Sequence, residues 1–162
     1  MHNCLVGSEM CIRDSYKDEE KSKATFKEIN GTRYSFPGDY ATVEKDGSIT
    51  LLGRGSVCIN TAGEKVFPEE VEEAMKRNEE VVDCLVVGIP DERFGERVIA
   101  VTSLDEGSDI DDTLLIDFCR ENLAGYKVPK QVLMVEHVRR APNGKADYKW
   151  AKSEALKAFG EK

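Results

Sequence analysis

LLGRGSVCINTAGEKVFPEEVE, residues 51–72, is the stretch that decides the fold. An apolar, strand-like run at 49–52 breaks at two glycines, and a second short apolar run at 57–59 precedes a glycine-containing turn. Pro68, followed by two acidic residues, predicts a helix start, because its missing N–H is unpaired there anyway and acids suit the positive helix end. A glycine hinge between two strands, with an arginine inside it, is unusual in a merely structural segment.

Length and composition indicate one ordinary domain, or a small domain with a piece of another. The chain has 162 residues, of which 40% are hydrophobic and 33% charged, and its formal net charge is −8. This negative charge argues against nucleic acid as a partner, because a phosphate backbone attracts a basic surface. No apolar run reaches the roughly 18 residues of a spanning helix, so we expect no transmembrane segment.

The five cysteines are scattered, and the chain has only two histidines. An odd number of cysteines does not favour a disulfide framework, and no zinc-ligand spacing emerges. We therefore expect no metal site in this chain and a reducing, cytoplasmic setting.

Residues 1–15 do not fit the pattern that follows them. They have neither the charged start nor the apolar core of a signal peptide, and they resemble translated adaptor sequence. We interpret them as a non-native leader; the alternative is a native loop, and neither interpretation gives them a function. Residues 16–55 predict a charged helical turn followed by two hairpins, at Asn30-Gly31 and Asp46-Gly47. This segment is too short to bury a core of its own.

Residues 56–162 predict a small α+β domain, one mixed sheet with helices packed on it. The apolar spacing predicts helices at 68–77, 109–122 and 147–158 and strands at 81–89, 97–104 and 131–135. The strand at 81–89 is apolar almost throughout, so we expect it to be buried on both faces and to end at Pro90. The turn at 94–96 is expected only to reverse the chain.

Two of these helices have an apolar face that the spacing identifies. The face of the first helix carries Val71, Ala74 and Met75, and the face of the second carries Leu114, Leu115 and Phe118.

Three ordered motifs resemble those of the adenylate-forming acyl-CoA synthetases: Gly38-Asp39, the hinge stretch that begins at Gly53-Arg54, and Pro142-Asn143-Gly144-Lys145. The amino-acid sequence of the hinge stretch is most similar to that of the fatty-acyl and steroid-side-chain CoA ligases. The resemblance covers roughly residues 16–157. It implies that residues 16–55 are the end of a large adenylation domain and that residues 56–162 are the C-terminal mobile domain.

Lys145 lies in a turn that places a lysine at the tip of a loop, where most lysines are simply solvated. The resemblance implies instead a catalytic role at the carboxylate and the ATP α-phosphate, and a compact ammonium suits the charge that these two anions share. The resemblance also implies that Asp39 binds the ribose hydroxyls of the nucleotide and that Arg54 lies by the ribose and phosphates. Turn formation by Asp39 and a surface ion pair of Arg54 are the structural alternatives.

Ser56 matches the hinge position of the family, where relatives commonly have Asp or Lys. Gly63 matches a loop that lines the pantetheine tunnel in the thioester-forming state, and it is also an ordinary turn glycine. No catalytic role is assigned to Asn60, which stands where some relatives have a lysine.

The resemblance implies a ligase that activates a carboxylic acid with ATP to acyl-AMP and then transfers the acyl group to CoA. Mg²⁺ is expected on the ATP phosphates, with ligands in the missing N-terminal domain, because this chain has no phosphate-binding loop. The fragment alone is expected to be inactive. Two alternatives remain open: a stand-alone nucleotide-binding or partner-docking module, and an adenylating enzyme whose acceptor is a carrier-protein thiol.

Overall fold

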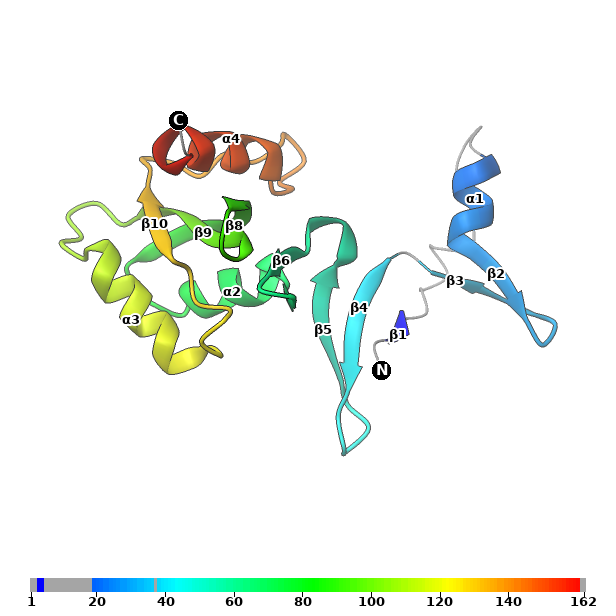
Figure 1. Ribbon diagram of the computed structural model, residues 1–162. Helices are drawn as coiled ribbons and strands as arrows, with labels where there is room; N and C mark the ends of the chain where they lie inside the picture. The colour runs from blue at the N-terminus through cyan, green and yellow to red at the C-terminus, as the bar shows by residue number, and fades with distance from the viewer. Residues whose placement is uncertain (1–2, 5–18, 37, 161–162) are drawn as a thin grey trace. The chain divides into compact units, whose positions relative to one another are not determined.

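The computed structural model divides the chain into two compact units, Met1–Ser56 and Val57–Lys162 (Figure 1). It describes residues 3–4, 19–36 and 38–160, and each unit is treated by itself. The interpretation of residues 1–15 as a leader therefore falls outside the described residues, apart from Asn3 and Cys4.

The first unit consists of short β structure and one short helix, as the sequence predicts. Its elements are β1 (Asn3–Cys4), α1 (Glu19–Thr25), β2 (Phe26–Ile29), β3 (Thr32–Ser35), β4 (Asp39–Val43) and β5 (Ile49–Arg54). The β2–β3 hairpin turns at Asn30 and Gly31, whose φ angles of 52° and 76° are those of a type I′ turn. The β4–β5 hairpin turns at Asp46-Gly47, where the Asp46 carboxylate accepts hydrogen bonds from the Ser48 amide and hydroxyl. Both hairpin predictions are confirmed.

The second unit is one five-stranded sheet with three helices packed on it. Its elements are β6 (Ile59–Thr61), β7 (Glu64–Val66), α2 (Pro68–Met75), β8 (Val81–Asp91), β9 (Gly95–Leu104), α3 (Asp112–Asn122), β10 (Gln131–Met134) and α4 (Tyr148–Phe159). Strand β9 is central, since it pairs antiparallel with β8 and β6 and parallel with β10. The predicted α+β class with a mixed sheet is confirmed.

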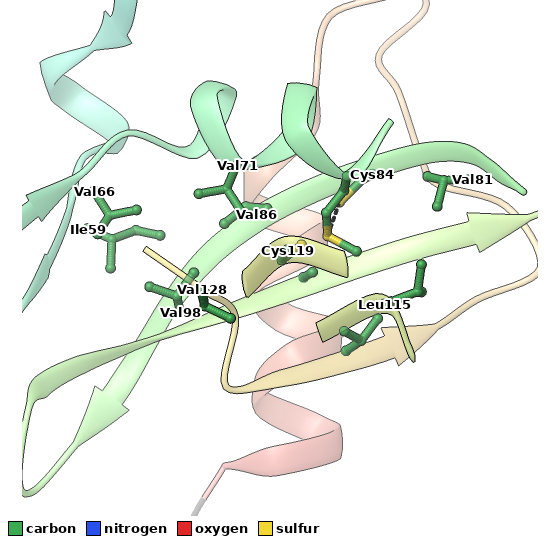
Figure 2. Close-up of a cluster of buried hydrophobic side chains, with 13 residues drawn as sticks. Ile59, Val66, Val71, Val81, Cys84, Val86, Val98, Leu115, Cys119 and Val128 are labelled. Carbon is green, nitrogen blue, oxygen red and sulfur yellow. Dashed lines mark hydrogen bonds between the residues drawn. The ribbon is translucent and has the colours of Figure 1, made fainter. Parts of the chain in front are cut away.

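Strand β8 is buried on both faces, and its side chains alternate between two apolar clusters. Cys84 and Val86 belong to a cluster with α2 and α3, which Figure 2 shows. Leu85, Val87 and Ile89 belong to a second cluster, on the side of α4. The expected two-sided burial is therefore confirmed, and it places the core on both sides of the β8–β9 pair.

The expectation that this strand ends at Pro90 is wrong, because β8 continues to Asp91. Pro90 lies opposite Glu96 within the ladder. Proline is tolerated in a strand at the edge of a sheet, where its missing N–H leaves no neighbour unpaired. Among the described strands, β8 pairs with β9 alone.

The helix faces follow the predicted period with one exception. The three apolar residues expected on the buried face of α2 are all buried. On α3, Leu115 and Cys119 are fully buried, whereas Leu114 is 55% exposed. Ile116 and Leu123 also pack against the core, so the buried stripe of α3 lies one residue further along than expected and turns Leu114 towards solvent.

Glu72 is a carboxylic acid inside the core of the second unit, only 6% exposed. It accepts a hydrogen bond of 2.9 Å from the Val86 amide, on the edge strand, and one of 3.3 Å from the Tyr148 hydroxyl, on α4. Burial is the largest cause that raises the pKa of Glu72, to about 7, and it outweighs these two hydrogen bonds. Glu72 thus joins α2, β8 and α4 through one side chain.

We expect the stability of this unit to fall with rising pH because of Glu72. The folded chain binds the Glu72 proton more tightly than the unfolded chain does, because the pKa of Glu72 is higher in the folded chain. Binding of this proton therefore stabilises the folded chain fully below about pH 4.5, and the stabilisation is lost as the pH rises through about 7. Between pH 5 and pH 8 the wild-type chain should lose about 2 to 3 kcal/mol more stability than Glu72→Gln. Urea unfolding followed by fluorescence of Trp150, the single tryptophan, measures this difference.

Glu73→Gln is the matched control, because Glu73 is the next residue of α2 and its side chain is 70% exposed. It should keep the wild-type pH dependence. A pH dependence that is unchanged in Glu72→Gln would show that Glu72 is already ionised in the folded chain at neutral pH.

Candidate functional site

Strands β4 and β5 bring two of the sequence motifs together in the first unit. Asp39 and Arg54 are directly opposite each other across the ladder. The Gly55 amide donates a hydrogen bond of 3.2 Å to the Gly38 carbonyl. A Cβ on Gly55 would lie 2.4 Å from Cε2 of Tyr40, so any other residue here would have to displace this ring. Asp39 is half-buried, and the side chain of Arg54 lies outside the described part of the chain.

Ser56, the expected hinge residue, lies in a short 3-10 helix, η2 (Gly55–Val57). The division between the two compact units falls directly after Ser56. Its side chain is outside the described part of the structure. The expected hinge position therefore coincides with the junction of the two units.

Gly63 is in the two-residue turn that connects β6 and β7. Ala62 and Gly63 have φ angles of 50° and 84°, both in the left-handed region, as a type I′ turn requires. No atom lies within 4 Å of a Cβ placed on Gly63. The backbone conformation, rather than lack of space, therefore favours glycine here. We refer to residues 60–64 as the Gly63 loop.

The turn between β8 and β9 holds the Gly63 loop. The Ala62 amide donates a hydrogen bond of 2.8 Å to the Phe94 carbonyl. The Asn60 amide donates one of 3.0 Å to Oε2 of Glu96. The sequence predicted only a reversal of the chain at 94–96, and the contacts of Glu96 are thus an addition that the sequence did not reveal.

Lys145 is exposed at the end of a tight loop, residues 141–145, which we call the Lys145 loop. The Ala141 amide donates to the Lys145 carbonyl, and the Gly144 amide donates to the Ala141 carbonyl, at 2.9 and 2.8 Å. The side-chain oxygen of Asn143 accepts a hydrogen bond of 3.2 Å from the Lys145 amide. Gly144 has a φ of 77°, which explains the glycine before the lysine. The predicted turn is present.

Arg140 connects the Lys145 loop to the sheet. Its Nε and Nη2 donate hydrogen bonds of 2.6 and 2.7 Å to the two carboxylate oxygens of Asp83, on β8. Its Nη1 donates one of 3.2 Å to the Gly144 carbonyl. Although burial alone would raise it, the hydrogen bonds from Arg140 and the Cys84 amide lower the pKa of Asp83 below its usual value.

Sequence reasoning missed Arg140 and Asp83, although one signal was present. Asp83 is the single acid within the apolar run 81–89. An acid in a buried strand needs a cationic or hydrogen-bonding partner, and that need could have directed attention to the two arginines before the Lys145 loop.

The two loops of the second unit are attached at opposite ends of the β8–β9 hairpin. Asp83 holds the Lys145 loop near the start of β8, and Glu96, which pairs with Pro90, holds the Gly63 loop near its end. Pro90 is seven positions after Asp83 in the strand, a distance of about 23 Å. This unit therefore presents an exposed lysine and an exposed glycine turn at separate places. Within the described residues, no group of three or more His, Cys, Asp or Glu side chains could hold a metal ion.

Curated proteins similar to this chain are CoA ligases. Over 139 residues the chain is 59% identical to 3-oxocholest-4-en-26-oate–CoA ligase from Rhodococcus rhodochrous, and 54% identical to a medium/long-chain-fatty-acid–CoA/3-oxocholest-4-en-26-oate–CoA ligase from Mycobacterium tuberculosis. Each match covers 86% of this chain and 25% of the relative. The chain thus spans about a quarter of the length of these relatives.

Solved structures with the same fold are adenylate-forming enzymes. The o-succinylbenzoate CoA synthetase of Bacillus subtilis, in complex with its acyl-adenylate intermediate, matches with a TM-score of 0.77 and 26% identity, over 86% of this chain and 28% of that protein. The amide bond synthetase McbA from Marinactinospora thermotolerans matches with a TM-score of 0.75 and 27% identity, over 87% and 28%.

The family match lies within the second unit and includes the last residue of the Lys145 loop. Residues 70–145 match the AMP-binding enzyme C-terminal domain. With the three ordered motifs, the mixed sheet and the relatives above, this match confirms the predicted family. The chain belongs to the adenylate-forming acyl-CoA synthetase family, of whose members it matches the C-terminal part.

Proposed function

We propose that this chain is the C-terminal part of an acyl-CoA ligase that activates a fatty or steroid-side-chain acid with ATP. The observation that carries the proposal is the 59% identity to a ligase of a steroid-side-chain acid. Identity of 47% to a medium-chain acyl-CoA ligase from Mycobacterium avium supports the same substrate class. The remaining three quarters of such an enzyme, with the acyl and adenine pockets, would belong to a large N-terminal domain.

The proposed reaction has two half-reactions. In the first, a carboxylate oxygen attacks the α-phosphorus of ATP, which forms acyl-AMP and releases pyrophosphate. In the second, the CoA thiol attacks the acyl carbonyl carbon, which forms the thioester and releases AMP. Mg²⁺ would accompany the ATP phosphates, with ligands outside this chain.

Lys145 is the proposed catalytic residue of the first half-reaction. Two anions must approach each other during adenylation, and an ammonium at the tip of an exposed loop can stabilise the charge that they share. Asp39 would accept hydrogen bonds from the ribose hydroxyls, and Arg54 would lie by the ribose and phosphates. Their opposed positions on β4 and β5 support a shared nucleotide site.

The second half-reaction would use the Gly63 loop. Rotation of the small domain about Ser56 would withdraw Lys145 and bring this loop to the pantetheine of CoA, and such gating needs only a few hinge residues. The unit boundary directly after Ser56 supports this proposal. So does the separation of the two loops along β8.

The acceptor is proposed to be CoA, rather than a carrier-protein thiol or an amine. Fold similarity does not choose between acceptors, since the matching structures include both a CoA synthetase and an amide bond synthetase. Sequence similarity supports CoA, because relatives at 47% to 59% identity are CoA ligases. Comparing CoA with a phosphopantetheine-bearing protein as acceptor tests this choice.

A cytoplasmic location is also proposed. Cys58, Cys84 and Cys119 are free thiols, as is usual in a reducing compartment. Within the described residues, no helix combines the length and the apolar character that crossing a membrane requires.

Replacing Lys145 by Ala in the full-length enzyme should abolish adenylation, measured as ATP–pyrophosphate exchange, and should spare thioester formation from supplied acyl-adenylate. A chimera in which this chain replaces the matching segment of the Rhodococcus ligase serves the same purpose. Lys149→Ala, an exposed lysine four residues away, should leave both half-reactions unchanged. Equal loss of both half-reactions in Lys145→Ala would contradict the assigned role.

A further inference from the structure

We propose that Arg140 and Asp83 are positioning residues that aim Lys145 during adenylation. This inference rests on the function proposed above, and it names the part of the fold that fixes the catalytic loop in place.

The contacts of Arg140 show how the Lys145 loop is held. Hydrogen bonds within the loop set its shape, but they do not by themselves fix its place on the domain. Arg140 supplies that link, because one guanidinium binds both oxygens of Asp83 and the Gly144 carbonyl, one residue before the lysine. An antiparallel bridge between Arg140 and Ala146 closes the base of the loop.

Asp83 provides a fixed attachment point for this guanidinium. It lies on β8, a strand buried on both faces, and its own side chain is 20% exposed. The Cys84 amide donates a hydrogen bond of 2.9 Å to Asp83 Oδ1, which orients the carboxylate. A two-point hydrogen bond between a guanidinium and a carboxylate fixes direction as well as distance, which a lysine in place of Arg140 would not reproduce.

The consequence for catalysis is geometric. Lys145 has a long flexible stem, so its ammonium is placed accurately only if its backbone is. A displacement of about 1 Å in a reacting group can lower a rate by about 100-fold. Loss of the two-point contact between Arg140 and Asp83 should therefore reduce the rate of adenylation. It should leave the Gly63 loop, attached at the other end of the β8–β9 hairpin, unaffected.

The test uses the full-length enzyme or the chimera, with the two half-reactions measured separately. Arg140→Ala should lower the rate of adenylation about 10- to 100-fold and change thioester formation from supplied acyl-adenylate less than about twofold. Arg140→Lys and Asp83→Asn keep part of the contact and should show intermediate losses. Arg139→Ala, at the neighbouring arginine, should match the wild type.

A double-mutant cycle distinguishes a positioning role of Arg140 from a general disturbance of the fold. If Arg140 acts only through Lys145, then Arg140→Ala should cause no further loss of adenylation in a Lys145→Ala background. Equal losses in both half-reactions, or a further loss in that background, would overturn the inference. If Lys145→Ala itself has no selective effect on adenylation, the proposed function fails instead. If Arg140→Ala does not fold, the same comparison of the two half-reactions is made with Arg140→Lys and Asp83→Asn, where a selective loss of adenylation supports the inference and equal losses overturn it.

An independent set of contacts supports a second inference: Glu96 is a positioning residue for the Gly63 loop. Its Oε2 accepts a hydrogen bond of 3.0 Å from the Asn60 amide, and its Oε1 lies 3.6 Å from Nζ of Lys152. A Cβ on Gly88 would lie 3.0 Å from the Glu96 carboxyl and 2.8 Å from Ile59. The glycine in this buried strand therefore makes room for Glu96 to reach the loop.

Glu96→Ala should have the opposite selectivity from Arg140→Ala. Thioester formation should fall about 10-fold or more and adenylation should remain near wild type, because Lys145 keeps its own attachment. Exchange of the Asn60 amide with deuterium should accelerate, while the Ala62 amide, which donates to a backbone carbonyl, should stay protected.

Lys152→Ala removes the ion pair but leaves the Asn60 hydrogen bond, so it should change neither half-reaction by more than about twofold. Unchanged exchange of the Asn60 amide in Glu96→Ala, or loss of adenylation to the same degree as thioester formation, would overturn this second inference.

Discussion

The pairing of β8 with β9 is the interaction on which the second unit depends. The ladder joins Val81 to Leu104 at one end and Asp91 to Gly95 at the other, and both faces of β8 are covered by apolar side chains. Burial on two faces stabilises this hairpin, by about 25 cal/mol for each Å² of apolar surface removed from water. A rigid strand is a suitable base for loops that must be aimed.

Both candidate loops are attached to this hairpin rather than to each other. The Lys145 loop is held through Asp83 and Arg140, and the Gly63 loop is held through Phe94 and Glu96. The two loops are attached near opposite ends of one hairpin, with attachment points separated by about 23 Å along the strand direction, so they turn together when the unit turns. That arrangement suits a domain that would present first one loop and then the other, because no part of the domain itself needs to refold between the two presentations.

The fold was largely predictable because its signals are local. The Asn30-Gly31 turn requires positive φ angles, and the apolar run at 81–89 has no polar face to expose, so sequence alone determines both. The prediction that Leu114 is buried was wrong because the segments that pack against a helix decide which of its residues are buried. Those segments are distant from α3 in the sequence. The prediction that the strand ends at Pro90 was wrong because a proline is tolerated within an edge strand, and only the order of strands in the sheet shows that β8 lies at an edge.

The candidate site was predictable only where a motif named the residue. Asp39 and Arg54 were chosen from motifs 15 residues apart, and the ladder of β4 and β5 places them opposite each other. Glu72, Asp83 and Glu96 were not found, because their partners, among them Val86, Arg140 and the Asn60 amide, come from distant segments of the chain. A long-range hydrogen bond leaves no pattern of spacing in the sequence.

The central claim is that one small domain serves two half-reactions by turning at Ser56, and substitution of this residue by proline tests it most directly. Proline fixes φ near −65° and restricts the residue before it, so the junction would be confined to a narrow range of orientations. The measurement is the rate of each half-reaction in the full-length Ser56→Pro enzyme. The account predicts that one half-reaction stays near the wild-type rate while the other falls about tenfold or more. Wild-type rates in both would contradict it.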